Sequence, residues 1–399
     1  MTIKPIVKLL IVSGLSTAVI AAHHTPNHQD KKVKKSGDCI SSYHSSVIAG
    51  NSYLRKIPSS QSKLYRAVDS EIGYYYEKLG ESNDTKMRIN HINMLIASPI
   101  GQGLNFALNT RYGGQYLSPI DWSADFATLQ GTTPNPQSFH VDEVYLTYFN
   151  QSTSPLYAKI GKSFQDFGNY ESPYTYNRSL SQIATQFLGS GVSVGASSNQ
   201  GVYGNVYTWQ SKPVTTVEIV NKPFKNFGFK IGFHGQMNQV SLNTNFSMIN
   251  DVAQALSISD LSISKETDNS VKKKVGAYQL FGQVAYQGIG AQVSYTAAAK
   301  NLVEHTGDPV VVSDVENTKP KIASIGLSYQ FKGLDRDHKV SIAYDQNSDK
   351  GQAILPKSSL LLNYLMNVNK HYCVHASYGR YKQSSAHADL FNAGVSVKL

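Results

Sequence analysis

The residues best suited to chemistry in this chain are charged side chains in or beside segments of alternating polarity. Three occupy polar positions within such segments and three lie in long polar connections: Arg111, Glu143 and Lys159, then Asp121, Asp166 and Arg178. Cations that face carboxylates across a water-filled lumen create a transverse field, which orients a polar solute and slows an apolar one. We expect these charges to line a constriction of such a lumen. Its positive side would comprise Arg111, Lys159 and Arg178, and its negative side Glu143, Asp121 and Asp166. The alternative interpretation is that these charges form pairs that only hold the connections in place.

Sequence motifs for catalysis or for cofactor binding do not occur in the chain. It contains no Gly-rich phosphate loop, His-Glu-x-x-His, paired-cysteine metal motif or Gly-x-Ser-x-Gly elbow. A serine with His371 or His375 would resemble the Ser-His pair of barrel-borne hydrolases, and His23, His24 and His28 would suit a metal ion. An incidental origin explains these histidines more simply. We therefore expect no enzyme activity, no cofactor, no bound metal and no nucleic-acid partner.

The amino terminus has the pattern of an export signal. Lys4 and Lys8 precede a short apolar stretch, and small residues around Ala21 and Ala22 provide a cleavage site. The apolar stretch is too short to span a membrane, and the mature chain contains no apolar run of about 18 residues. We expect a signal peptide over 1–22, a basic and mostly disordered periplasmic segment over 23–66, and one domain over 67–399.

From residue 67 onward the polarity alternates in many segments of about ten residues, the length that a tilted strand needs to cross a bilayer. We count sixteen candidate strands: 67–78, 86–97, 102–113, 139–150, 155–164, 188–197, 201–210, 227–237, 240–249, 276–286, 289–299, 321–331, 339–347, 358–369, 372–381 and 389–399. In the last segment the alternation of apolar and polar residues begins at Phe391 and continues to Leu399. Tight and long connections alternate between the segments, as in outer-membrane barrels.

These segments predict an all-β, transmembrane antiparallel β-barrel of about sixteen strands in the outer membrane of a Gram-negative bacterium. A sheet of strands satisfies all its backbone hydrogen bonds in lipid only when it closes into a barrel. The competing prediction, a secreted β-sandwich or propeller, explains the alternation but not the polar set on the second face of so many strands. An even strand number places both barrel ends on the periplasmic side.

Charge and cysteines add two smaller expectations. The formal charge is +10, and most of it lies before residue 67, including Lys31, Lys32, Lys34 and Lys35, so the high pI says little about a pore. The chain has two cysteines, Cys39 and Cys373. Because the periplasm is oxidising, they can pair or remain as two isolated thiols.

Two stretches carry a resemblance to a known family. The first runs from Gly161-Lys-Ser-Phe through Phe167-Gly168 to Pro173 and Arg178, and the second comprises Thr318-Lys-Pro320, Ala343-Tyr-Asp-Gln-Asn and Ile354-Leu-Pro-Lys. Their order and spacing are similar to the LbtU-type siderophore porins, sixteen-strand outer-membrane barrels linked to uptake of iron chelators. The likeness covers about 67–399. The short basic amino-terminal extension has no heptad pattern, and the chain ends in Leu399, where many such barrels end in Phe.

The resemblance implies a porin that passes a ferric siderophore or a similar small polar solute across outer-membrane lipid. With about 44 mature residues before the first strand there is no room for a globular plug, so TonB-dependent transport is not expected. Two alternatives stay open: a general porin for small anionic or polar nutrients, and a non-conducting surface or adhesion barrel. A homotrimer is the oligomer that porins of this size often form.

Overall fold

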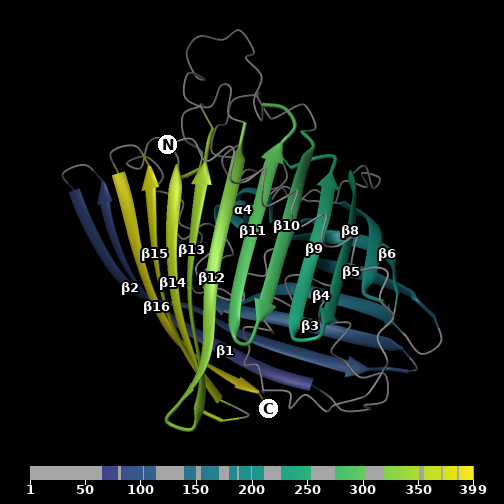
Figure 1. Ribbon diagram of the computed structural model, residues 1–399, viewed down its shortest axis with the longest axis horizontal. Helices are drawn as coiled ribbons and strands as arrows, with labels where there is room; N and C mark the ends of the chain where they lie inside the picture. Colours follow the sequence, from purple (N-terminus) through teal and green to yellow (C-terminus); the bar gives the residue numbers. More distant parts are fainter. Residues whose placement is uncertain are drawn as a thin grey trace. The chain divides into compact units, whose positions relative to one another are not determined.

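The computed structural model, shown in Figure 1, describes most of the chain from Tyr65 to Lys398. The described residues are 65–79, 82–101, 103–113, 139–149, 154–169, 179–186, 188–198, 200–210, 226–252, 275–301, 319–349, 355–369, 372–383 and 386–398. The expected signal peptide and nearly all of the expected segment 23–66 lie outside them.

Sixteen β-strands occur within the described ranges. They are β1 (Tyr65–Leu79), β2 (Ser82–Pro99), β3 (Leu104–Gly113), β4 (Phe139–Phe149), β5 (Leu156–Phe164), β6 (Leu188–Ser197), β7 (Val202–Gln210), β8 (Asn226–Met237), β9 (Val240–Ile249), β10 (Ala277–Tyr286), β11 (Ile289–Ala298), β12 (Lys321–Gly333), β13 (Arg336–Asn347), β14 (Ser358–Asn367), β15 (Tyr372–Gln383) and β16 (Ala386–Lys398). Each coincides with one predicted segment. The largest boundary difference is at β2, which begins at Ser82 instead of residue 86.

Every strand pairs antiparallel with its sequence neighbours, and the sheet closes on itself into a barrel. The closing pair is β1 with β16, whose register runs from Ala67 opposite Lys398 to Lys78 opposite His387. Closure gives each strand two hydrogen-bonded neighbours and leaves no sheet edge, which a membrane-spanning sheet requires. The predicted fold class is therefore confirmed.

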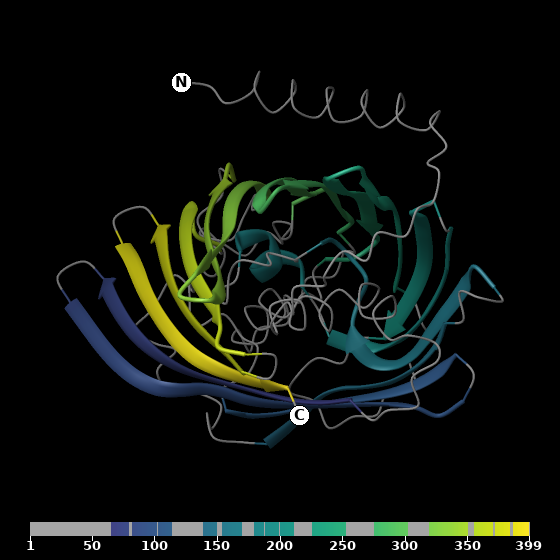
Figure 2. The ribbon, with the colours of Figure 1, turned by 60° about the horizontal axis from the view of Figure 1, so that its bottom comes forward.

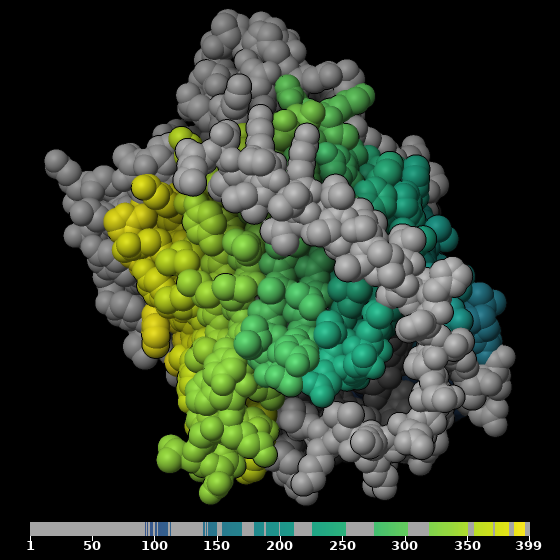
Figure 3. All heavy atoms as spheres, in the orientation of Figure 1, coloured from purple at the N-terminus to yellow at the C-terminus, as the bar shows by residue number. Residues whose placement is uncertain are grey.

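The two faces of the barrel wall have opposite polarity. On β4, Val144 and Leu146 are each 38% exposed on the outside, whereas Glu143 is only 1% exposed on the inside. On β12 the outward Ile325, Leu327 and Tyr329 alternate with inward residues in the same way, as the sequence predicted. Figure 3 shows part of this outer face over the later strands. An apolar exterior around a polar interior is the pattern of a barrel whose solvent is lipid.

Large inward tyrosines place the phenol ends of their rings close to glycines of the next strand. A Cβ built on Gly195, Gly228 or Gly232 would meet a tyrosine ring of the preceding strand: Tyr157, Tyr207 and Tyr203 respectively. A glycine at these places lets the ring lie against the wall, so the aromatic area is buried without projecting across the lumen.

One short helix, α4 (Leu180–Thr185), lies inside the ring of strands, as Figure 2 shows. The Ser179 side chain accepts a hydrogen bond from the Gln182 backbone N–H and caps its first turn. The strand pattern predicts a long connection over this stretch, and the helix within it was not predicted. Within the described ranges, no helix has the length and apolarity to span a membrane.

Candidate functional site inside the barrel

The candidate site is built on the connection between β5 and β6, which turns into the barrel. We call its described residues, 164–169 and 179–186, the inner loop. Residues 164–169 and all of α4 are buried. A connection buried in a polar lumen must pair its backbone groups with the wall, and the inner loop does so at four places.

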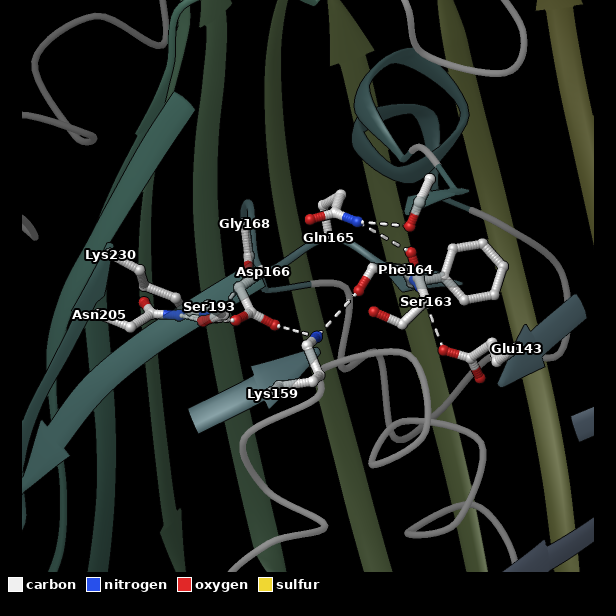
Figure 4. A network of polar contacts seen from close by, with 11 residues as sticks. Glu143, Lys159, Ser163, Phe164, Gln165, Asp166, Gly168, Ser193, Asn205 and Lys230 are labelled. Atoms are coloured by element: carbon white, nitrogen blue, oxygen red, sulfur yellow. Dashed lines mark hydrogen bonds and ion pairs between the residues drawn. The ribbon is translucent and has the colours of Figure 1, made fainter. Parts of the chain in front are cut away.

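The first anchor is the carboxylate of Asp166, which contacts three wall strands (Figure 4). Its Oδ1 lies 2.8 Å from Lys159 Nζ of β5. Its Oδ2 accepts hydrogen bonds from Ser193 Oγ of β6 at 2.7 Å and from Asn205 Nδ2 of β7 at 2.6 Å. Both charged side chains are more than nine-tenths buried, so partners on every side offset the cost of taking them out of water.

The second anchor is Glu143 on β4. Its Oε1 accepts the Phe164 backbone N–H at 3.1 Å, and its Oε2 accepts Asn109 Nδ2 of β3 at 3.3 Å. Lys159 Nζ donates to the other side of the same residue, the Phe164 carbonyl, at 3.2 Å. The loop therefore leaves β5 with its first backbone unit held by one carboxylate and one ammonium group.

The third anchor lies at Gly168, farther around the wall. Its N–H donates to Ser247 Oγ of β9 at 2.9 Å, and its carbonyl accepts from Lys230 Nζ of β8 at 2.6 Å. Gly168 has φ 72°, in the left-handed region that glycine adopts without strain. Asn169 N–H then donates to the Gln279 side chain of β10.

The fourth anchor is α4. Leu180 N–H donates to Asp345 Oδ2 of β13 at 2.9 Å, and Ser359 Oγ of β14 donates to the same oxygen at 2.7 Å. The apolar side of the helix packs in a buried cluster with residues of β12 to β16 and with Leu355 of the connection before β14: Leu180, Ile183 and Ala184 with Ile322, Ala343, Leu355, Leu361, Tyr381, Ala388 and Leu390. The inner loop thus contacts wall strands from β4 to β16. These contacts hold it in place, and it takes up part of the cross-section of the lumen.

Next to the loop the wall of β9 to β11 carries uncharged amides with unused hydrogen-bonding capacity. Among the described residues, Asn243 Oδ1, Gln292 Oε1 and both polar side-chain atoms of Asn245 have no hydrogen-bond partner. In the register, Gln283 lies directly between Asn243 and Gln292. The unpaired atoms are themselves buried, so they are polar groups left without a partner within the inner wall.

Of the six predicted site residues, the structure brings three together. Lys159 and Asp166 contact each other, and Glu143 holds the adjacent peptide unit. These charges do not oppose one another across the lumen, and for this trio the geometry agrees with the alternative interpretation, pairs that hold a connection. Arg111 lies on β3 opposite His140 and Asn93, and its side chain is not described. Asp121 and Arg178 lie outside the described residues.

Several partners of the loop were not predicted from the sequence: the uncharged Ser193, Asn205 and Ser247, and the charged Lys230 and Asp345, which lie far away along the chain. Their inward position followed from the strand alternation, but no local signal tells which loop a given inward residue binds. The helix did have a signal, because Ser179 and Gln182 have the spacing of a capping box. No group of three or more His, Cys, Asp or Glu suited to a metal ion occurs in the described part of the chain.

Comparison with known proteins gives structural likeness alone. No protein-family model and no curated protein matches the chain. The outer-membrane channel DcaP of Acinetobacter baumannii matches with a TM-score of 0.53 and 11% identity, over 84% of this chain and 96% of that one. Salmonella typhi OmpF, solved with daunomycin, matches with a TM-score of 0.56 and 11% identity, over 86% of this chain and 99% of that one. The anion-selective porin of Comamonas acidovorans matches with a TM-score of 0.51 and 9% identity, over 84% of this chain and 99% of that one.

At these identities the likeness shows the fold, which is the β-barrel of outer-membrane porins. The likeness is to porins in general, and the narrower resemblance to the LbtU-type siderophore porins stays a prediction.

Proposed function

We propose that this protein is an outer-membrane porin through which small polar solutes diffuse passively into the periplasm. The observation that supports this most is the inner loop, which narrows a closed barrel from within and is held by polar contacts. A protein that only needed a barrel as a membrane anchor would gain nothing from a buried, hydrogen-bonded connection inside it. The half-buried side chains of Asn243, Gln283 and Gln292 add uncharged polar groups to the inner wall beside the loop.

We propose a ferric siderophore as the solute, taken up without TonB, on the resemblance of the 161–178 and 318–357 stretches to the LbtU-type porins. The uncharged amides favour a second candidate, a general porin for small polar nutrients. Arg111, Asp121 and Arg178 are the charges that remain for the proposed transverse field, because Lys159, Asp166 and Glu143 hold the inner loop. Outer-membrane lipid is the proposed environment, and a homotrimer is the proposed oligomer.

Two experiments test these proposals. Liposomes that contain the purified barrel should swell in solutions of small neutral and charged solutes, with rates that fall as solute size rises. Absence of swelling with every solute would identify a non-conducting barrel and contradict the porin proposal. Growth on a ferric siderophore as sole iron source, with and without the gene, separates the two solutes: equal growth would favour the general porin.

The proposed transverse field is tested with the double variant Arg111→Ala and Lys159→Ala. We expect a changed ion selectivity in planar bilayers, because two cations are removed. Unchanged selectivity and conductance would contradict a role for these residues in the pore.

A further inference from the structure

Polar side chains gather on the outer face of β15 and β16, close to the turn that joins these two strands. Asp389 is the centre of the cluster. Its Oδ1 lies 2.7 Å from Arg380 Nε and its Oδ2 lies 2.9 Å from Arg380 Nη2, and Oδ1 also accepts the Tyr378 hydroxyl at 2.5 Å. His387 Nε2 lies 3.6 Å from Oδ2. One carboxylate therefore holds an arginine, a tyrosine and a histidine in place.

The alternation of burial places this cluster on the outside of the barrel. Arg380 lies opposite Asp389 in the register, and Phe391, the next residue of β16 on the same face, is 49% exposed. The inward neighbours Tyr381 and Leu390 are at most 2% exposed. The Arg380 side chain is 50% exposed, although that of Asp389 is only 14% exposed. The guanidinium group is thus held from one side and accessible from the other.

Two cations of the cluster have donors left for a further partner. Arg380 uses Nε and Nη2 for Asp389, so within the described part of the chain its Nη1 is unpaired. Lys382, the next outward residue of β15, is exposed and lies opposite His387. Its ammonium group has no partner among the described residues. Residues two apart on a strand are about 7 Å apart, so one phosphate group can accept hydrogen bonds from both long side chains.

The cluster lies where the apolar band of the outer face ends. Arg380 is eight residues from Tyr372, which is the first residue of β15 and 46% exposed. Eight residues extend about 26 Å along a strand, or about 20 Å in height at a tilt of about 40°, and the apolar band of such barrels is about 25 Å tall. Between the two levels the outer face carries apolar residues such as Leu362 and Phe391.

The orientation of the barrel decides which leaflet the cluster meets. In the proposed orientation the barrel begins and ends on the periplasmic side, so the turn between β15 and β16 is extracellular. The strands β14, β15 and β16 lie side by side in Figure 1. Their outer face at this end is therefore in contact with the outer leaflet of the membrane.

We propose that this cluster binds a phosphate group of a phosphorylated glycolipid, the lipid class that forms the outer leaflet of a Gram-negative outer membrane. Arg380 Nη1 and the Lys382 ammonium group donate hydrogen bonds to the phosphate, and the acyl chains lie over Leu362 and Phe391. Charge complementarity selects this occupant: two cations against the carboxylate of Asp389 leave one net positive charge, which an anionic headgroup at the membrane surface stabilises. Because the site is on the outside of the barrel, it does not depend on passage of a solute through the lumen.

Binding is measured on the full-length protein, folded in detergent micelles, by native mass spectrometry with diphosphorylated lipid A as the glycolipid. We expect a saturable complex with the wild type. Dephosphorylated lipid A should bind about tenfold more weakly, because the charge-assisted hydrogen bonds to phosphate are lost. No complex with lipid A, or equal binding of the two forms, would overturn the proposal. Phosphatidylglycerol that binds as tightly as lipid A would overturn the choice of a glycolipid.

Variants test whether the cluster is the site. Lys382→Gln should bind lipid A about tenfold more weakly, whereas Lys382→Arg, which keeps the cation, should bind it as the wild type does. Arg380→Lys should also bind more weakly, because a lysine can still pair with Asp389 but has no second nitrogen for the phosphate. Heat-modifiable mobility on gels checks that each variant is folded.

Lys332→Gln is the matched control, because Lys332 is an exposed lysine on β12 at the periplasmic end of the barrel. We expect this variant to bind lipid A with the affinity of the wild type. A loss equal to that of Lys382→Gln would show that only net charge matters and would contradict the site. Undiminished binding in both Lys382→Gln and Arg380→Lys would contradict it as well.

Discussion

At the scale of single residues, the most consequential group is the carboxylate of Asp166. It is the shared acceptor for Lys159, Ser193 and Asn205, which come from three neighbouring strands. A cation that is 7% exposed cannot be rehydrated when its partner is removed, so the pair is far more costly to break than an exposed ion pair.

We therefore expect Asp166→Asn to lower the free energy of unfolding by about 3 kcal/mol, because it leaves the Lys159 ammonium buried without an anion. Urea unfolding of the barrel in lipid vesicles measures this. The double variant Lys159→Met with Asp166→Asn should recover part of the loss, since no charge then remains buried. A single variant as stable as the wild type would show that water reaches the pair and that it does not hold the loop.

At the scale of elements, the strands are fitted to one another by tyrosine rings that lie close to glycines. Gly195 of β6 shows one of the two closest of these contacts: a Cβ there would lie 2.4 Å from Tyr157 Cζ and 2.5 Å from the Gly204 carbonyl oxygen. The backbone atoms involved belong to paired strands and cannot move apart without loss of hydrogen bonds.

We expect Gly195→Ala to destabilise the barrel by about 1–3 kcal/mol through overpacking. Gly282→Ala on the outer face of β10 is the control for replacing a strand glycine without a close neighbour, because its Cβ would meet only Val293 Cγ2, at an ordinary 3.7 Å. Unfolding of both variants in vesicles, under one set of conditions, gives the comparison. Equal stability would contradict the close fit of Tyr157 on Gly195.

At the scale of the whole molecule, the barrel has an apolar exterior and a polar interior. An arginine introduced on the outer face therefore has a different effect on stability from one introduced on the inner face. Leu327 lies outward at the middle of β12 and is 51% exposed, and Gln292 lies inward on β11.

Leu327→Arg should cost about 2–4 kcal/mol, because it places a charge in the hydrocarbon of the bilayer. Gln292→Arg is expected to leave stability nearly unchanged and to shift ion selectivity toward anions. Unfolding in vesicles and reversal potentials in planar bilayers measure the two effects. Equal stability losses would mean that the exterior is not in contact with lipid.

The last strand makes a further prediction at this scale. β16 pairs with both β15 and β1, so it closes the barrel. We expect removal of residues 386–399, or Leu399→Asp, to abolish insertion into the outer membrane. A normally heat-modifiable barrel in the membrane fraction would refute this.

Much of the fold could be predicted from the sequence, for a physical reason that single residues illustrate. Val144 and Leu146 alternate with Glu143 and Tyr145, and a strand side chain has only two directions, so one apolar stripe fixes which residues face out. The same stripe at the end of the chain, from Phe391 to Val395, identified the closing strand. At the candidate site, the sequence pattern named Lys159, Glu143 and Asp166 but did not predict that Lys159 pairs with Asp166. The role of these residues in a pore stays a prediction.

What the sequence by itself determined is the barrel: sixteen amphipathic strands, their order, and the polarity of their faces, all of which depend on a period of two residues. What only the tertiary structure decided is the course of the inner loop. Its contacts join Asp166 to Asn205 and Leu180 to Asp345 across 39 and 165 residues of chain. Such pairs form because the curved wall brings distant strands around one lumen, and no local pattern in the sequence records which strand a loop will meet.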